Sequence, residues 1–224
     1  MDGQRNPAGE SLDLAERTAA AIRTLITTGD LAPGARLSEA QLSAEHDVSR
    51  NTLREAFRVL AQEGLLVRRP HAGVVVAIPS LASIIDIYRV RRMIEVQALR
   101  AAPARHPSAR DMSSAFAEQL RARDAGDWTA VGTANMRFHT AIVALADSER
   151  LNRVYANVSA ELRLAFGLID DPEYLHAPYL DRNGIVLERY EAGDQGAAAA
   201  ELDDYLVQSE RIVLAAYARY ANGA

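Results

Sequence analysis

The chain of 224 residues contains no cysteine and no lysine. Without cysteine it has no disulfide, no thiol nucleophile and no thiolate ligand for a metal. Every basic side chain is therefore an arginine, which suits bidentate hydrogen bonds to phosphate groups and to guanine. A compositional bias of the genome explains the missing lysine more simply.

The sequence also lacks any hydrophobic run long enough to span a membrane. Its first ten residues, MDGQRNPAGE, are polar and include two acidic side chains, unlike a secretory signal. These two absences predict a cytoplasmic protein with no membrane partner. Hydrophobic residues make up 49% of the chain, which is enough for a core in one large or two modest domains.

Positive charge is concentrated in one segment. The net charge of the chain is −5, but residues 50–69 carry five arginines and two glutamates. A local excess of arginine within an acidic chain indicates an anion-binding surface rather than a generally basic coat.

Residues 29–64 have the pattern of a helix-turn-helix. The segment reads GDLAPGARLSEAQLSAEHDVSRNTLREAFRVLAQEG. Ser38 is a predicted N-cap, with Gln41 completing a capping box. Ser49 is a predicted N-cap of a longer helix that ends at Gly64. That helix has arginines along one face and apolar side chains along the other, as expected for a DNA-reading helix packed on a small core.

The flanking segments complete a winged helix. Residues 12–28 have helical periodicity. After Gly64, two β-prone runs at 65–69 and 74–77 flank Pro70–Gly73, which predicts a two-stranded hairpin. We therefore predict a winged helix-turn-helix domain over residues 12–79, preceded by a disordered leader at residues 1–11.

From residue 80 onward only helical patterns occur, which predicts an all-helical antiparallel bundle over residues 80–224 that encloses a pocket and mediates dimerisation. The fold class is therefore mostly α, with a winged helix-turn-helix followed by this bundle. Its predicted helices lie at about 80–102, 108–125, 127–146, 148–169, 178–192 and 194–222.

The candidate DNA contacts are Arg36, Ser49, Arg50, Asn51, Thr52, Arg54 and Gly73. Arginine donates two hydrogen bonds to guanine and asparagine pairs with adenine, whereas hydroxyl groups and a helix N-terminus suit phosphate oxygens. The alternative is a solvated arginine face without a partner. Arg58 is a weaker candidate, since it can contact phosphate or pair with Glu55 or Glu63.

These residues carry a family resemblance. The stretches GDLAPGARLSEAQLS, VSRNTLREAFRVLAQEGLL and HAGVVV resemble the GntR family of bacterial transcription regulators over residues 12–78. The resemblance implies that Arg36, Arg50, Arg54 and Gly73 contact DNA. Asn51 stands where the family more often has threonine, which bears on base preference.

The second half resembles the FadR subgroup and its helical ligand-binding domain, often called FCD. The matching segments are YRVRRMIE at residues 88–95, NMRFH at 135–139 and EAGD at 191–194. Many such domains bind a divalent metal through an Asp or Asn, a His four residues later and two further His. Here Asn135 and His139 match the first pair, but Asn183 and Tyr205 replace the later histidines.

A single strong ligand is too few for a tight metal site. We therefore expect no cofactor, with His139 as a weak metal candidate. The predicted effector-binding residues are Arg91, Asn135, His139, Asn183 and Tyr205. Arg91 favours a carboxylated metabolite. The alternatives are an ion pair between Arg91 and Glu95, and simple core packing of His139 and Tyr205.

Together these features predict a homodimeric transcriptional regulator, more specifically a repressor, whose affinity for a near-palindromic double-stranded operator depends on a small-molecule effector. Two alternatives remain: a metal-dependent regulator of the same type that uses His139, and a helical scaffold whose winged helix binds protein. The chain has no Glu-x-x-His repeat, phosphate loop, G-x-S-x-G or zinc-protease motif, so an enzyme is not expected.

Overall fold

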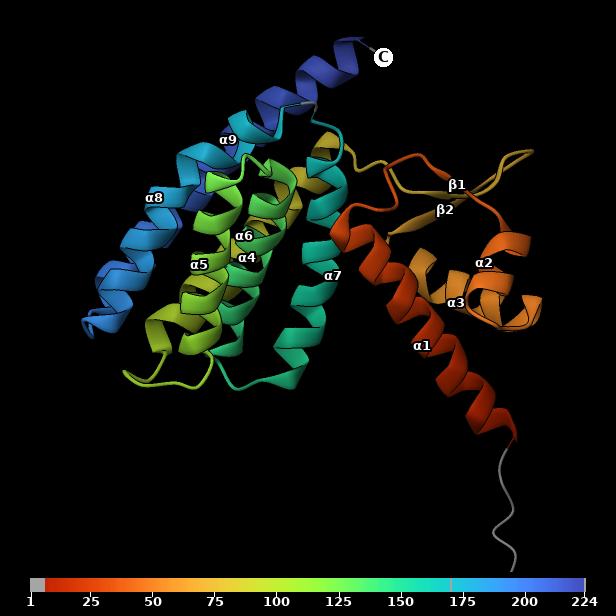
Figure 1. The fold of residues 1–224 in the computed structure, drawn as a ribbon, viewed down its shortest axis with the longest axis horizontal. Coiled ribbons are helices and arrows are strands. Elements are labelled where there is room, and N and C mark those ends of the chain that lie inside the picture. The colour runs from red at the N-terminus through yellow and green to blue at the C-terminus, as the bar shows by residue number, and fades with distance from the viewer. Residues whose placement is uncertain (1–6, 170, 224) are drawn as a thin grey trace, which may run out of the picture. The chain divides into compact units, whose positions relative to one another are not determined.

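The computed structural model describes residues 7–169 and 171–223 (Figure 1). The chain divides into two compact units, and the division falls between Ile78 and Pro79. The first unit combines helices with a small sheet, whereas the second is helical throughout its described residues. The mostly helical fold class, a winged helix-turn-helix followed by a helical bundle, is therefore confirmed.

The first unit is built on a helix-turn-helix backed by α1. Its elements are α1 (Pro7–Thr28), β1 (Arg36–Leu37), α2 (Glu39–Glu45), α3 (Arg50–Gln62), β2 (Leu66–Arg69) and β3 (Gly73–Val76). Helix α1 packs against α3. Ile22 and Ile26 of α1 are fully buried, as are Leu53 and Leu60 of α3. This apolar contact holds the opposite face of α3 toward solvent.

The sheet of the wing has three strands rather than the two that the sequence indicated. Strands β2 and β3 form the expected antiparallel hairpin, with Leu66 opposite Val76. Strand β1 adds to the other edge of β3, with Arg36 opposite Val75. A strand of two residues is too short to show an alternation of apolar and polar side chains, so no pattern in the sequence predicts it.

Helix α1 begins earlier than predicted. Residues 7–11 were expected in a disordered leader, but they form the first turns of the helix. Proline is tolerated in the first helical turn because its missing N–H has no helical partner there. The remaining leader, residues 1–6, lies outside the described residues.

The caps of the helix-turn-helix are partly as predicted. The hydroxyl of Ser38 accepts a hydrogen bond from the backbone N–H of Gln41 at 3.3 Å. The side chain of Gln41, however, donates to Glu45 at 2.7 Å instead of returning to Ser38, so the capping box is half formed. Ser49 caps α3 by accepting from the backbone N–H of Thr52 at 3.1 Å.

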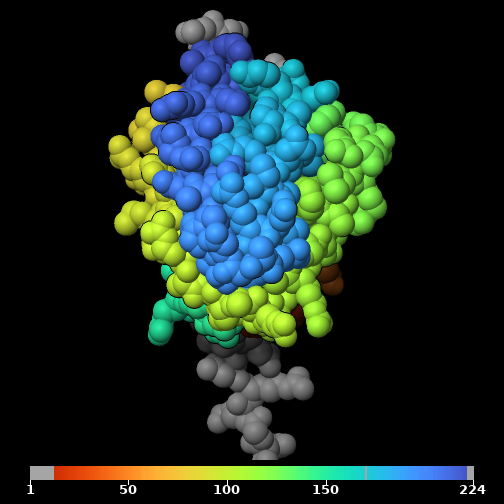
Figure 2. Space-filling view, turned by 90° about the vertical axis from the view of Figure 1, so that its left-hand side faces the viewer, coloured from red at the N-terminus to blue at the C-terminus, as the bar shows by residue number. Residues whose placement is uncertain are grey.

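The second unit is an antiparallel bundle with one shared apolar core. Its helices are α4 (Leu81–Ala101), α5 (Ala109–Asp124), α6 (Trp128–Ala144), α7 (Glu149–Phe166), α8 (Pro172–Glu191) and α9 (Gln195–Gly223). Helix α4 packs against α6, α7 and α9, and α8 runs beside α9 along the face drawn in Figure 2. None of the helices in the described ranges has the length and hydrophobicity that a membrane span requires.

Helix α8 starts at Pro172, whereas the sequence pattern predicted a start at Pro178. The Asp171 carboxylate caps the helix by accepting from the backbone N–H of Tyr174 at 2.9 Å. Pro172 then occupies the first turn, where proline fits. Pro178 lies inside the helix, so reading it as a helix start was wrong: a proline inside a helix costs one backbone hydrogen bond but does not always end the helix.

A close contact between α6 and α8 depends on a glycine. A Cβ atom placed on Gly132 would lie 2.3 Å from Nε2 of His176. The His176 ring is buried and packs edge-on against Phe166, so it has no free space to move into.

We therefore expect Gly132→Ala to lower the free energy of unfolding by about 1 to 3 kcal/mol through overpacking. Chemical denaturation followed by circular dichroism measures the change. Gly196→Ala is the matched control, because the nearest atom to its added Cβ is 3.6 Å away; its stability should be unchanged or slightly higher. Equal stability of the two variants would contradict this view of the contact.

Candidate functional site

The start of α3 combines a structural cap with exposed polar side chains. The hydroxyls of Ser49 and Thr52 lie 2.8 Å apart, and Thr52 is buried. Their first role is therefore to begin the helix. Arg50, Asn51 and Arg54 are exposed around the same turn. They present the hydrogen-bonding groups that a recognition helix inserts into a major groove.

Arg54 has an acidic partner that the sequence analysis missed. Its Nε donates to the Glu39 carboxylate at 3.0 Å, which links the start of α2 to α3. This pair is partly exposed, and such pairs contribute little to stability. Glu39 therefore holds the Arg54 guanidinium in place, and a phosphate or base can replace it at small cost.

The later arginine of the same face is held by its own helix. Arg58 donates to the Glu55 carboxylate at 2.9 Å, whereas Glu63 pairs with Arg23 of α1 at 2.6 Å. Of its two predicted acidic partners, Glu55 and Glu63, Arg58 pairs with Glu55. The Arg23–Glu63 pair instead joins α1 to the end of α3.

The wing contributes further candidates. Arg36 is exposed on β1, and Gly73 begins β3 with φ +77° and no neighbouring atom within 4 Å of an added Cβ. Arg68 and Arg69 on β2 are also exposed. These two arginines belong to the positive charge of residues 50–69 but were not among the predicted DNA contacts.

The five residues predicted for the pocket lie in one buried polar network. Every helix from α4 to α9 contributes to it. Its members are Arg91 and Glu95 of α4, Gln119 of α5, Asn135 and His139 of α6, Tyr155 of α7, Asn183 of α8 and Tyr205 of α9. All are buried.

The charged half of the network centres on Glu95. Its carboxylate accepts hydrogen bonds from Arg91 Nε at 2.7 Å and from the Tyr155 hydroxyl at 2.7 Å. His139 Nδ1 lies 2.7 Å from the other carboxylate oxygen. Burial raises the pKa of Glu95, but the charge of Arg91 and the hydrogen bonds from His139 and Arg91 together outweigh it and bring the pKa to about 2. Glu95 is therefore ionised and neutralises Arg91.

His139 is neutral in this setting. Burial lowers its pKa below the ordinary value for histidine, although Glu95 opposes the shift. Because an ionised carboxylate only accepts hydrogen bonds, Nδ1 carries the proton and Nε2 has the lone pair. Tyr205 then donates its hydroxyl hydrogen to Nε2 at 2.9 Å. Both ring nitrogens are thus engaged.

The neutral half of the network consists of amides. Asn183 Nδ2 donates to Asn135 Oδ1 at 2.6 Å and to Gln119 Oε1 at 2.9 Å. The Asn183 Oδ1 and Gln119 Nε2 atoms are buried without a hydrogen-bond partner among the described residues. Buried polar atoms without partners are uncommon, and these two leave one acceptor and one donor open for a further polar group.

A further arginine lies beside this half. The Arg182 guanidinium stands over the Tyr205 ring, 5.8 Å from its centroid. It pairs with Glu201 at 2.7 Å, and Arg189 lies 3.5 Å from the same carboxylate. Arg182 Nη1 is buried without a hydrogen-bond partner among the described residues. Two arginines sharing one glutamate leave a local excess of positive charge.

The predicted pocket residues therefore do lie together, but Arg91 differs from expectation. It forms the ion pair with Glu95 that was the alternative in the sequence analysis. Glu95 could be found from the sequence as the residue four positions after Arg91. Gln119, Tyr155 and Arg182 carry no such signal, because they come from distant helices.

The donors present do not fit a divalent metal. Within residues 7–169 and 171–223, no three His, Cys, Asp or Glu side chains gather as possible metal ligands. The free lone pair of His139 is used by Tyr205, and Asn183 directs its amide hydrogens toward Asn135 and Gln119. A metal on His139 would have to break this network.

Comparison with known families matches both units. Residues 14–76 match the model described as "Bacterial regulatory proteins, gntR family". Residues 86–208 match the FCD domain. The second match alone spans more than half of the chain.

Individual proteins show the same similarity. A crystal structure of a putative GntR transcriptional regulator from Rhodococcus is 35% identical, with a TM-score of 0.84 over 91% of this chain and 98% of that one. A probable D-xylose utilization operon transcriptional repressor from Paenarthrobacter nicotinovorans is 28% identical over 81% of this chain and 80% of its own length. The transcriptional repressor RspR of Escherichia coli is 27% identical over 71% and 75%.

The buried ion pair makes a direct prediction. Glu95→Gln leaves the Arg91 guanidinium buried without a counter-charge, so the free energy of unfolding should fall by about 3 to 5 kcal/mol at neutral pH. Glu118→Gln is the control, because its pair with Arg137 is exposed and its loss should cost about 1 kcal/mol or less. Urea titration measures the free energy of unfolding of both variants. Equal losses would contradict the neutralisation of Arg91 by Glu95.

Proposed function

The chain belongs to the GntR family of bacterial regulatory proteins and carries an FCD domain. We propose that it binds a near-palindromic operator as a homodimer and represses transcription. A small-molecule effector modulates this binding. It is a transcriptional regulator and not an enzyme. Two relatives are named as repressors, which supports repression as the sign of the regulation.

The exposed start of α3 is the observation that carries the DNA-binding part. Arg50, Asn51 and Arg54 stand on the first turns of a capped helix, and the apolar face of that helix is buried against α1. We assign base contacts to Arg50 and Asn51 and to Arg54 after its release from Glu39. Arg36 and the wing tip at Gly73 contact the backbone or the minor groove, and the Ser49–Thr52 cap supports the helix.

The unpaired amide atoms support an effector site between α5, α6 and α8. Asn183 and Gln119 offer one acceptor and one donor, which suit a hydroxyl group. Arg182 offers a buried guanidinium N–H for a carboxylate. A small hydroxylated carboxylate carries both kinds of group. The carboxylated effector expected from the sequence is thus kept, with Arg182 as its anchor in place of the neutralised Arg91.

The effector alters DNA affinity only as far as it prefers one arrangement of the two DNA-binding units over another. The network supplies a physical route for such a preference. A ligand that bonds to Asn183 Oδ1 acts on the same amide whose Nδ2 donates to Asn135 and Gln119, and Asn135 adjoins Tyr205 at 3.4 Å. Occupancy at α8 therefore affects contacts of α5, α6 and α9.

Base contacts are tested with DNA sites selected by the wild-type protein from a random duplex library. Arg50→Ala and Arg54→Ala should each weaken binding to the selected site by about 5-fold to 150-fold, since a bidentate base contact is worth about 1 to 3 kcal/mol. Arg58→Ala is the control. It should weaken binding less than the other two variants, and by the same factor on the selected site and on unrelated DNA. If neither Arg50→Ala nor Arg54→Ala weakens binding, α3 is not the recognition helix.

The effector site is tested by thermal shift with a panel of small hydroxycarboxylates. A binding compound should raise the melting temperature of the wild type and lose that effect in Asn183→Leu, which removes the free acceptor Oδ1 and the amide that holds Gln119. Asn152→Leu makes the same change at an exposed position of α7 and should respond like the wild type. A compound that stabilises Asn183→Leu as strongly as the wild type binds elsewhere and contradicts this site.

A further inference from the structure

The first turn of α2 places a carboxylate beside one of the proposed base contacts. Glu39 is the first residue of α2, and the Ser38 cap fixes its position in the helix. Its Oε2 atom accepts a hydrogen bond from Nε of Arg54 at 3.0 Å. A negative charge therefore lies next to a group that meets DNA, where it opposes the attraction between the protein surface and the phosphate backbone.

Stability does not account for this pairing. An acidic side chain in the first turn of a helix is stabilised by the helix dipole without any further partner. The side chains of Glu39 and Arg54 are 31% and 56% exposed, and such pairs add little to the stability of a fold. The contact nevertheless joins residues 15 positions apart, on the two helices of the helix-turn-helix. A role in DNA binding is the remaining reason for a carboxylate at this place.

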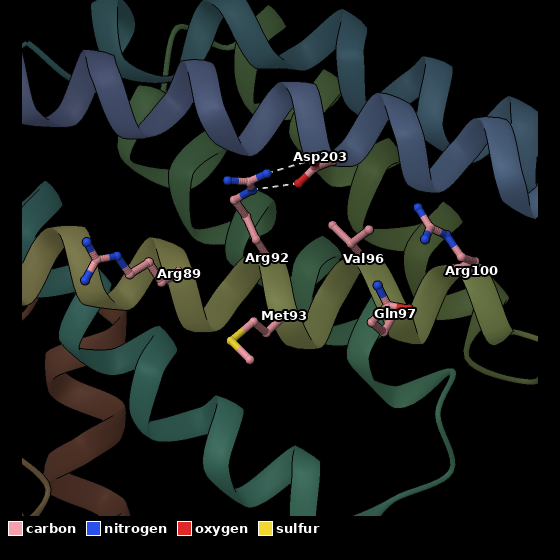
Figure 3. A pocket seen from close by; sticks show the side chains of 7 residues that line it. All are labelled: Arg89, Arg92, Met93, Val96, Gln97, Arg100 and Asp203. Atoms are coloured by element: carbon pink, nitrogen blue, oxygen red, sulfur yellow. Dashed lines mark hydrogen bonds and ion pairs between the residues drawn. The ribbon is translucent and has the colours of Figure 1, made fainter.

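The contact leaves most of the Arg54 guanidinium open. A guanidinium has five N–H donors, and the bond to Glu39 uses one of them. The exposed pair of Arg92 with Asp203 on the helical unit is different, because two hydrogen bonds of 2.6 and 3.0 Å join its groups (Figure 3). A two-point pair of that kind fixes an arginine firmly. Arg54 is held at a single point and keeps its two Nη groups for another acceptor.

The acceptor that replaces Glu39 determines what DNA binding gains. If a phosphate replaces it, one oxyanion takes the place of another, and the displaced carboxylate is left beside a negatively charged backbone. If a guanine replaces it, O6 and N7 accept two hydrogen bonds from Arg54. The cytosine of the same base pair presents its N4 amino group in the major groove, where a carboxylate can accept from it. A G·C pair therefore satisfies both side chains, whereas a phosphate satisfies only one.

We propose that Glu39 is a specificity-determining residue, which accepts a hydrogen bond from the cytosine of the G·C pair whose guanine Arg54 reads. The inference rests on the proposed function, because it requires α3 to be the recognition helix. In the free protein Glu39 competes with every phosphate that approaches Arg54, so it weakens binding to all DNA. Its own hydrogen bond is recovered only on a site with the correct base pair. Glu39 therefore lowers non-specific affinity more than operator affinity.

Glu55 provides a matched control on the same helix-turn-helix. It pairs with Arg58 at 2.9 Å, and its side chain is 37% exposed, close to the value for Glu39. This pair lies within one helix, and Arg58 is not assigned a base contact. Alanine at either position removes one negative charge. A general electrostatic effect on DNA binding is therefore expected from both variants, and a change in sequence discrimination from only one.

The first test compares affinities of the full-length protein, by fluorescence anisotropy at one salt concentration. The DNA is the site selected by the wild type and an unrelated duplex. Glu39→Ala should bind the unrelated duplex more tightly than the wild type does, and the ratio of the two affinities should fall by about fivefold or more. Glu55→Ala should change both affinities by the same factor. An unchanged ratio in Glu39→Ala, or an equal fall in both variants, would overturn the proposal.

Modified DNA tests the atom that Glu39 contacts. The guanine is located as the position at which Arg54→Ala loses discrimination, and its cytosine is replaced by N4-methylcytosine. This base keeps the hydrogen that pairs with guanine but has a methyl group in place of the amino hydrogen that faces the major groove. The wild type should bind the modified site about fivefold more weakly or worse, whereas Glu39→Ala should bind both sites equally. Equal binding by the wild type, or an equal loss in both proteins, would overturn the cytosine contact.

The outcomes separate this role of Glu39 from the proposed function. Circular dichroism checks that both alanine variants are folded, and the measurement on modified DNA uses the wild type itself. If Arg54→Ala binds the selected site as well as the wild type does, the base contact of Arg54 fails, and the role of Glu39 fails with it. If Arg54→Ala weakens binding while Glu39→Ala keeps the wild-type affinity ratio, only the role of Glu39 is overturned.

Discussion

The buried ion pair between Arg91 and Glu95 is the constraint on which the helical unit depends. Both groups lie out of water, at 3% and 0% exposure, and a buried charge without a partner is very costly. Their remaining hydrogen-bonding capacity has to be satisfied by other helices, and it is met by Tyr155 and His139. The packing of α4, α6 and α7 is therefore fixed by hydrogen bonds as well as by apolar contact. His139 in turn needs a hydrogen-bond partner for Nε2, which is the Tyr205 hydroxyl, and Tyr205 adjoins the amide of Asn135.

Exposed and enclosed arginines serve different purposes in this chain. The arginines on the outer face of α3 lie in solvent, and their pairs, such as Arg54 with Glu39, are partly exposed and easily exchanged. In the helical unit Arg91 is enclosed and cannot change partners without a large cost. The exposed arginines are suited to reversible binding of a polyanion such as DNA. Arg91 is suited to holding helices in register. Arg182 is paired with Glu201 but keeps one buried N–H without a partner among the described residues, so it can both hold helices together and bind a ligand.

Local signals in the sequence predicted much of the fold. Ser49 as a cap, the hairpin after Gly64 and the alternation of helices and breaks beyond Pro79 are determined by residues within a few positions of each other. Asn135, His139, Asn183 and Tyr205, which the family resemblance grouped, lie in one hydrogen-bonded network, and their role in binding an effector stays a prediction. Strand β1 was missed because its pairing with β3 decides it. The start of α8 was misplaced although its signal is local: Asp171 caps the helix and Pro172 occupies its first turn. The neutralisation of Arg91 by Glu95 and the roles of Gln119 and Arg182 depend on helix packing, which no local pattern encodes.

The protonation state of His139 is the property to measure first, because a neutral imidazole with its proton on Nδ1 both donates to Glu95 and accepts from Tyr205. We would measure the ¹⁵N chemical shifts of the His139 ring by NMR near neutral pH, before and after adding a chelator and then Zn²⁺. The account predicts a proton on Nδ1, an unprotonated Nε2 that accepts from Tyr205, and no change on either addition. An imidazolium, the opposite tautomer, or a shift caused by Zn²⁺ would contradict it.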